Sequence, residues 1–147
     1  MSQPIQIVVL GAMPEPLSTA ATTYLADTLH ECRIVLSDEE PHESSAPLRE
    51  LAASLVPDLE EIGDLLDGAT VSVDQGLVTF EVAMSRGHSG TMAHLRTQFV
   101  QLRLLGRHCG LLVPSDPEVA QFLTWLWDES TDQLHGRPPR PYRLREI

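Results

Sequence analysis

The residues best suited to chemistry lie in a short glycine-containing segment, residues 86–91, between a predicted strand and a predicted helix. A serine nucleophile often sits on such a turn, and Ser89 precedes Asp116 and His135 in the serine, acid, histidine order of one catalytic triad. The nucleophile motif G-x-S-x-G is incomplete, because Thr91 stands where its last glycine should be. We therefore assign no catalytic residue, and Ser89 is the one candidate that the sequence offers.

The same segment could bind an anion without performing a reaction. Glycine amides can approach a ligand closely, the predicted helix directs its positive end toward the segment, and an arginine adds a cation. The candidate ligand-binding residues are Arg86, Gly87, His88, Ser89, Gly90 and Thr91. Their spacing matches neither a P-loop nor a dinucleotide fingerprint. A second glycine-containing loop, residues 11–16, is expected after the first strand, so a small-ligand or anion-binding protein, or an enzyme, with its cleft between the two loops is one interpretation.

Two pairs of soft ligands could bind zinc if the strands that carry them were neighbours. The pairs are His30 with Cys32, and His108 with Cys109. The paired C-x-x-C spacing of structural zinc sites is missing, and both cysteines lie at the edge of an apolar run, as small core residues do. We therefore assign no metal and no cofactor, and expect both thiols to stay reduced in a cytoplasmic protein.

Charge is segregated along the chain. Residues 1–81 hold 15 acidic residues and two arginines, residues 82–147 hold six acidic residues and eight arginines, and the net charge is -11. Arg96, Arg103 and Arg107 are spaced so that they share one face of a predicted helix. They could receive a partner's carboxylates, or pair with acidic residues of the same chain. An acidic protein with so small a basic patch is unsuited to general nucleic-acid binding, because the phosphates would be repelled.

The C-terminal part carries the aromatic candidates for an interface. Trp125 and Trp127 flank a leucine and cannot both face one core at helical spacing, so one should lie at the surface or beneath the tail. The tail, residues 135–147, is rich in proline and arginine and should be extended. We expect Tyr142 to fold back over a tryptophan, or the tail to exchange with a second subunit.

The elements that must position these residues indicate a single α+β domain over residues 1–134. The sequence predicts a mixed sheet of about five short strands with three to four helices packed on it. The expected strands are residues 5–10, 33–36, 70–73, 77–84 and 109–113. The first two should form a parallel β-α-β unit, and the third and fourth a hairpin across Asp74, Gln75 and Gly76.

The expected helices follow from apolar spacing and capping signals. They cover residues 18–30, 48–66, 91–106 and 116–130, and the second is expected to break or kink at Pro57. Residues 37–47 should form a mobile acidic loop. The chain has no apolar run long enough for a membrane span. We therefore expect a non-enzymatic interaction or regulatory module that self-associates through its acidic and arginine-rich surfaces.

Overall fold

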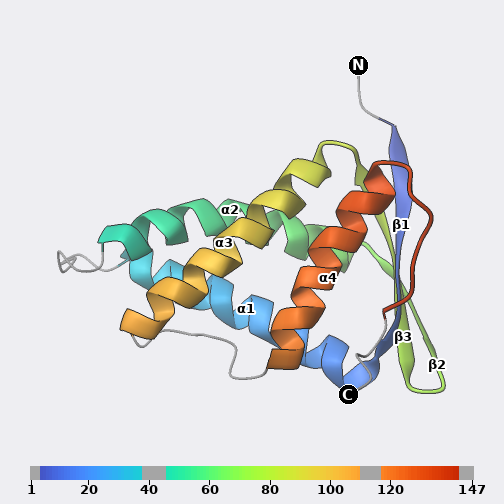
Figure 1. Ribbon diagram of the computed structural model, residues 1–147, viewed down its shortest axis with the longest axis horizontal. Helices are drawn as coiled ribbons and strands as arrows, with labels where there is room; N and C mark the ends of the chain where they lie inside the picture. Colours follow the sequence, from blue (N-terminus) through green and yellow to red (C-terminus); the bar gives the residue numbers. More distant parts are fainter. Residues whose placement is uncertain (1–3, 38–45, 110–116, 143–147) are drawn as a thin grey trace.

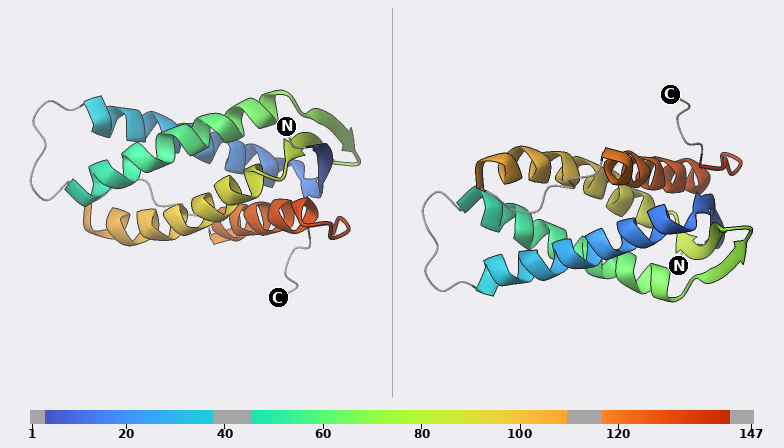
Figure 2. Two further views of the ribbon diagram at one scale, coloured as in Figure 1. Left: turned by 90° about the horizontal axis from the view of Figure 1, so that it is seen from above. Right: turned by 90° about the horizontal axis from the view of Figure 1, so that it is seen from below.

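The computed structural model describes residues 4–37, 46–109 and 117–142. They form a single α+β domain in which four helices pack against a three-stranded antiparallel sheet (Figure 1). The elements are β1 (Ile5–Pro14), α1 (Glu15–Ser37), α2 (Ala46–Asp67), β2 (Thr70–Asp74), β3 (Leu77–Ser85), α3 (His88–Cys109) and α4 (Pro117–Leu134). The helices make an elongated bundle with the sheet at one end (Figure 2). Within the described ranges, no helix has the length and apolarity needed to cross a bilayer.

The sheet has the order β1-β3-β2, so β1 and β2 are its two edges. β1 runs antiparallel to β3 from the pair Ile5 and Ser85 to the pair Pro14 and Leu77, with an irregularity between Leu10 and Met13. Alternate side chains of both strands point toward the helices, as the two-residue period of a strand requires. The buried set is Val8, Leu10, Met13, Val78, Val82 and Met84.

The predicted hairpin is confirmed. β2 and β3 pair from Asp74 and Leu77 at the turn to Thr70 and Glu81. The two turn residues, Gln75 and Gly76, have φ values of 52° and 78°, the left-handed conformation that a tight two-residue hairpin turn requires at both positions.

The predicted second strand, residues 33–36, is wrong. These residues are the last turn of α1, so the chain opens with β1, a long helix and a second helix, and the described sheet has no parallel pair. The buried face of the helix carries Leu25, Thr28 and Cys32, and Val35 and Leu36 are partly buried against the same core. Tertiary packing of this face outweighs the strand preference of the short run Ile34, Val35 and Leu36.

α2 is one continuous helix that passes through Pro57. The proline cannot donate to the carbonyl of Ala53, but both residues are exposed, so water can reach that carbonyl. α3 continues past Gly106 to Cys109, so the predicted stop at the glycine is wrong. The predicted core stripes of α2 and α3 are confirmed at Leu48, Leu51, Leu55, Leu59, Ile62, Met92, Leu95, Phe99 and Leu102.

Two predictions fall wholly or partly outside the described residues. Of the predicted strand 109–113, only the backbone of Cys109 is described, and it belongs to α3. Most of the predicted acidic loop lies outside as well, while its two ends belong to α1 and α2. α4 begins at Pro117, one residue after the predicted start, and buries Val119, Phe122, Leu123 and Leu126 as predicted.

Candidate functional site

The segment 86–91 is a two-residue turn followed by the first turn of α3. The Ser89 hydroxyl donates a hydrogen bond to the Arg86 carbonyl at 2.8 Å, which closes the turn locally. His135, the histidine of the hypothetical triad, lies just beyond α4 and is exposed, and Asp116 lies outside the described residues. Among the contacts of the described residues, the Ser89 hydroxyl therefore binds a backbone carbonyl and not a general base.

A carboxylate of the protein itself occupies the position expected for an anion beside this segment. Glu61 of α2 accepts a hydrogen bond from Thr91 Oγ1 at 2.9 Å and lies 3.1 Å from His88 Nε2. The Ser85 amide donates to His88 Nδ1 at 2.9 Å, which leaves Nε2 as the protonated nitrogen that faces Glu61. The segment therefore holds α3 to α2.

The two predicted ligand loops do not meet. Ser85, which leads into residues 86–91, pairs with Ile5 at one end of β1, whereas Pro14 pairs with Leu77 at the other end. Residues 11–14 belong to β1, and Glu15 and Pro16 begin α1. The predicted cleft between the loops is not formed, because the loops lie at opposite ends of the sheet.

Two basic residues of α3 contact acids of other helices in the same chain. His94 lies 2.7 Å from Asp58 of α2, and Arg96 lies 2.9 Å from Asp128 of α4. Arg103 borders a groove along α4, and the side chain of Arg107 lies outside the described residues. Part of the charge segregation therefore serves contacts between helices of one molecule.

The predicted zinc pairs do not gather into a site within the described part of the chain. On α1, His30 is exposed whereas Cys32 is buried, so the two side chains do not converge. Burial raises the pKa of Cys32 to about 11, so its thiol stays protonated at neutral pH. The side chains of His108 and Cys109 are not described. No group of three or more potential metal ligands is found among the described residues.

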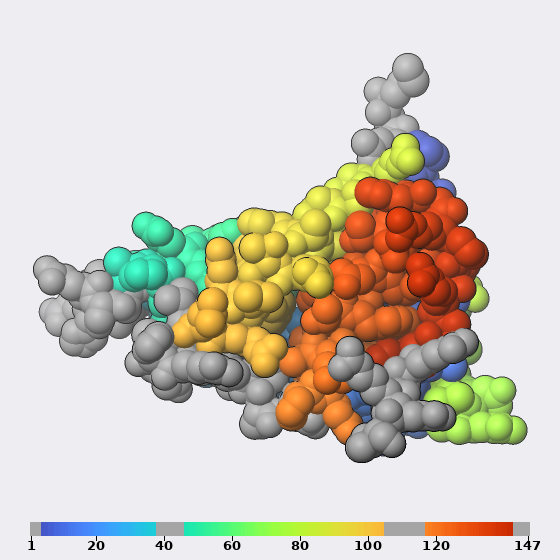
Figure 3. Space-filling model, viewed as in Figure 1, coloured from blue at the N-terminus to red at the C-terminus, as the bar shows by residue number. Residues whose placement is uncertain are grey.

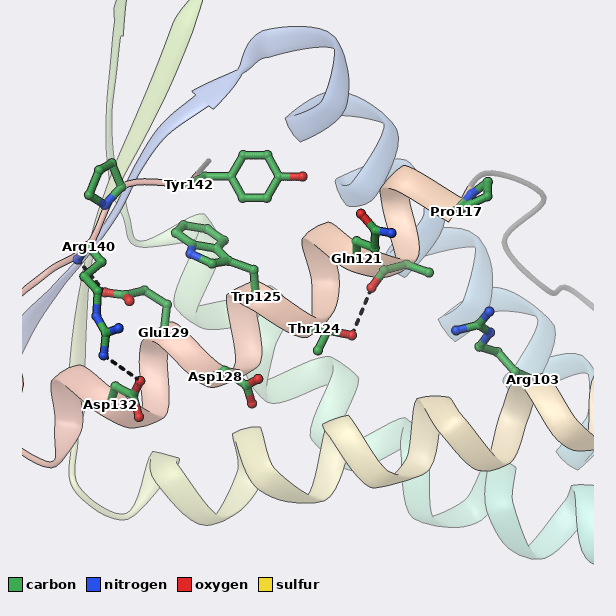
Figure 4. A pocket seen from close by; sticks show the side chains of 12 residues that line it. Arg103, Pro117, Gln121, Thr124, Trp125, Asp128, Glu129, Asp132, Arg140 and Tyr142 are labelled. Carbon is green, nitrogen blue, oxygen red and sulfur yellow. Dashed lines mark hydrogen bonds and ion pairs between the residues drawn. The ribbon is translucent and has the colours of Figure 1, made fainter. Parts of the chain in front are cut away.

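The tail folds back onto its own chain as far as Tyr142. Trp127 is buried against Phe99, and the half-buried Trp125 contacts the Tyr142 ring edge-on at a centroid distance of 5.2 Å. Beside these rings runs a groove of about 840 Å³ along α4, with Arg103 at one end and Arg140 at the other (Figure 4). Figure 3 shows the surface of α4 and the tail from this side.

Several contacts join the tail to α4 within this groove. Asp132 accepts a hydrogen bond from Arg137. Asp132 also lies 3.7 Å from Arg140 (Figure 4). The buried carboxylate of Glu129 accepts hydrogen bonds from the Gln133 side chain and from the Arg140 amide. These contacts hold the tail against α4 along the groove.

The outer edge of β1 is partly closed by α4 and the tail. The Gln133 side chain accepts a hydrogen bond from the Val9 amide at 2.8 Å and donates one to the Val9 carbonyl at 2.7 Å. The Tyr142 amide donates to the Gly11 carbonyl at 3.1 Å. A side-chain amide and the tail thus take the place that a fourth strand would occupy at this end of β1.

The outer edge of β2 has no such cover among the described residues. All five residues of β2 are exposed, and Val71 and Val73 keep 51% and 57% of their surface accessible. Because Asp74 and Leu77 close a two-residue turn, the backbone groups of Thr70, Ser72 and Asp74 face β3, and those of Val71 and Val73 face outward. We call these outward backbone groups and the two valine side chains the β2 edge.

Sequence reasoning predicted the hairpin but missed the β2 edge. The available signal was the alternation of Val71 and Val73 with polar residues in a strand without lysine or proline, the residues that usually protect an edge. Comparison with family models, curated proteins and solved structures gave no match to this chain.

Proposed function

We propose that the protein is a non-enzymatic interaction module, of a regulatory or accessory kind, that docks to another polypeptide through the β2 edge. The observation that carries the proposal is the exposure of a whole edge strand, with two valines and two outward-facing backbone units. An unprotected edge is a template for an added strand, because each free amide and carbonyl gains a partner there. The hairpin tip also projects past the helices (Figure 1).

Association through the charged faces of two molecules has less support. Of the predicted interface residues, Arg96 has an ion-pair partner within its own chain, and the acidic face of α2 uses Asp58 and Glu61 for contacts to α3. These charges would have to leave existing partners before they could bind a second molecule. The sheet edge needs no such rearrangement.

The test places a photoreactive side chain at Ser72 of the full chain and crosslinks it in cells. Ser72 is exposed on the face of β2 away from the helices, so the probe leaves the outward backbone groups in place. We expect an adduct of discrete mass that Val73→Pro abolishes, because proline removes an amide that an added strand requires. The matched variant Val73→Thr keeps that amide and should keep the adduct.

Two results would contradict the proposal. One is the absence of any adduct of discrete mass. The other is an adduct that forms equally with proline and threonine at Val73, because a contact of this kind would not depend on the backbone of β2. An adduct of twice the chain mass would identify a second copy as the partner.

A further inference from the structure

We infer that the strand accepted at the β2 edge belongs to a basic partner and that apolar and cationic residues alternate along it. This inference rests on the proposed function and specifies the partner. It follows from the two different faces that β2 presents to a neighbouring strand.

The face of β2 toward the helices is apolar. Val71 lies opposite Phe80 and Val73 opposite Val78, and Val78 is buried. The valines continue this apolar layer past the helices and remain half accessible. An added strand places every second side chain directly beside them, and apolar side chains there would bury the exposed valine surface.

The opposite face of β2 is polar and acidic. It carries Thr70, Ser72 and Asp74, and Glu81 lies opposite Thr70 on β3. Asp74 and Glu81 are exposed and form no ion pair within the described residues. The intervening side chains of an added strand lie on this face, with Asp74 on the neighbouring strand and Glu81 one strand farther in. Arginine or lysine at these positions would face acidic side chains of the sheet.

The sequence around β2 is also acidic, which favours a basic partner. Residues 50–85 contain eight acidic residues and no arginine, lysine or histidine. A second copy would bring another such segment and another net charge of -11 to the same edge. Like charges across an interface disfavour the wrong partner, so charge complementarity favours a basic strand over a second copy.

The inference is tested with synthetic peptides and the full chain by fluorescence anisotropy. In three short peptides valine alternates with arginine, with serine or with glutamate, and a fourth groups the same valines and arginines in two blocks. We expect the alternating arginine peptide to bind about tenfold more tightly than the serine peptide, since the attractions to Asp74 and Glu81 each contribute modestly. The glutamate and block peptides should bind least, and added salt should reduce the arginine advantage.

Variants of the protein test which of its residues bind the peptides and which favour arginine. Val73→Pro should abolish binding of both the arginine and the serine peptide. Asp74→Asn with Glu81→Gln should remove the advantage of the arginine peptide. Asp27→Asn with Glu50→Gln removes the same amount of negative charge from other parts of the protein and should preserve most of that advantage. An advantage lost equally in both double variants would indicate attraction to the overall charge and overturn the inference.

The remaining outcomes separate this inference from the proposed function. If the serine and arginine peptides bind equally and Val73→Pro abolishes both, the edge accepts strands without charge selection, so the inference fails and the proposed function stands. If no peptide binds and light scattering shows a dimer that Val73→Pro dissociates, the occupant is a second copy and the inference also fails. If Val73→Pro changes none of these measurements, both fail.

Discussion

β1 and β2 are edge strands of the same sheet, but their outer backbones meet different surroundings. At β1, Gln133 and the tail take up the outward groups of Val9 and Gly11. At β2, the outward groups of Val71 and Val73 have no partner outside the strand pair within the described ranges. The covered edge therefore contributes to the stability of the fold, and the open edge is the one available for association.

We expect the largest effect on stability from replacing Gln133, whose side chain covers the edge of β1. Gln133→Leu removes both hydrogen bonds to Val9 and the donor to buried Glu129, so we expect a loss of about 2–4 kcal/mol in the free energy of unfolding. Urea denaturation measures the loss. The control Gln121→Leu lies on the exposed face of the same helix and should change stability by less than about 0.5 kcal/mol. Equal effects of the two variants would show that the covered edge has no special role.

Proline substitutions in β2 distinguish amides that face β3 from amides that face outward. Ser72→Pro removes an amide that faces β3, so it should destabilise the fold by about 3 kcal/mol. Val73→Pro removes an amide that faces solvent and should cost about 1 kcal/mol or less. Thermal or urea unfolding compares the two variants. A larger loss at Val73 than at Ser72 would mean that the outward assignment of the β2 backbone is wrong.

The smallest expected effect is a loosening of the covered edge at alkaline pH. Burial, followed by the charge of Glu118, raises the pKa of Tyr142 above its usual value of 10.0. The undocked tyrosine ionises at a lower pH than the docked one. Docking of Tyr142 therefore stabilises the protein below about pH 10, and this stabilisation is lost as the pH rises further. Tryptophan fluorescence should report the change, since Trp125 contacts the ring. The change should vanish in Tyr142→Phe, and its persistence there would assign it to another group.

The sequence was sufficient where local spacing and core packing agree. The hairpin across Gln75 and Gly76, and the buried stripes of α2, α3 and α4, combine a clear period with suitable turn or capping residues. The sequence also indicated that the tail docks on a tryptophan, but it left open whether the tail folds back or exchanges with a second subunit; the structure shows the contact within one chain.

The sequence was insufficient where distant residues decide the structure. The run Ile34, Val35 and Leu36 favours a strand locally, and only the packing of α1 makes it helical. Likewise, nothing near Gln133 signals that its side chain completes the edge of β1. The openness of β2 depends on which segments fail to reach it, and spacing within one strand cannot reveal that.

The hydrogen bonds between Val9 and Gln133 join residues 124 positions apart, and this separation has a consequence for synthesis on the ribosome. β1 is made before the helices, and the side chain that completes its edge emerges from the ribosome only 124 residues after Val9. Until then a nascent chain with β1 and the hairpin paired would present two open strand edges. Slow translation or a late stop codon before Gln133 should therefore favour aggregation of the unfinished chain.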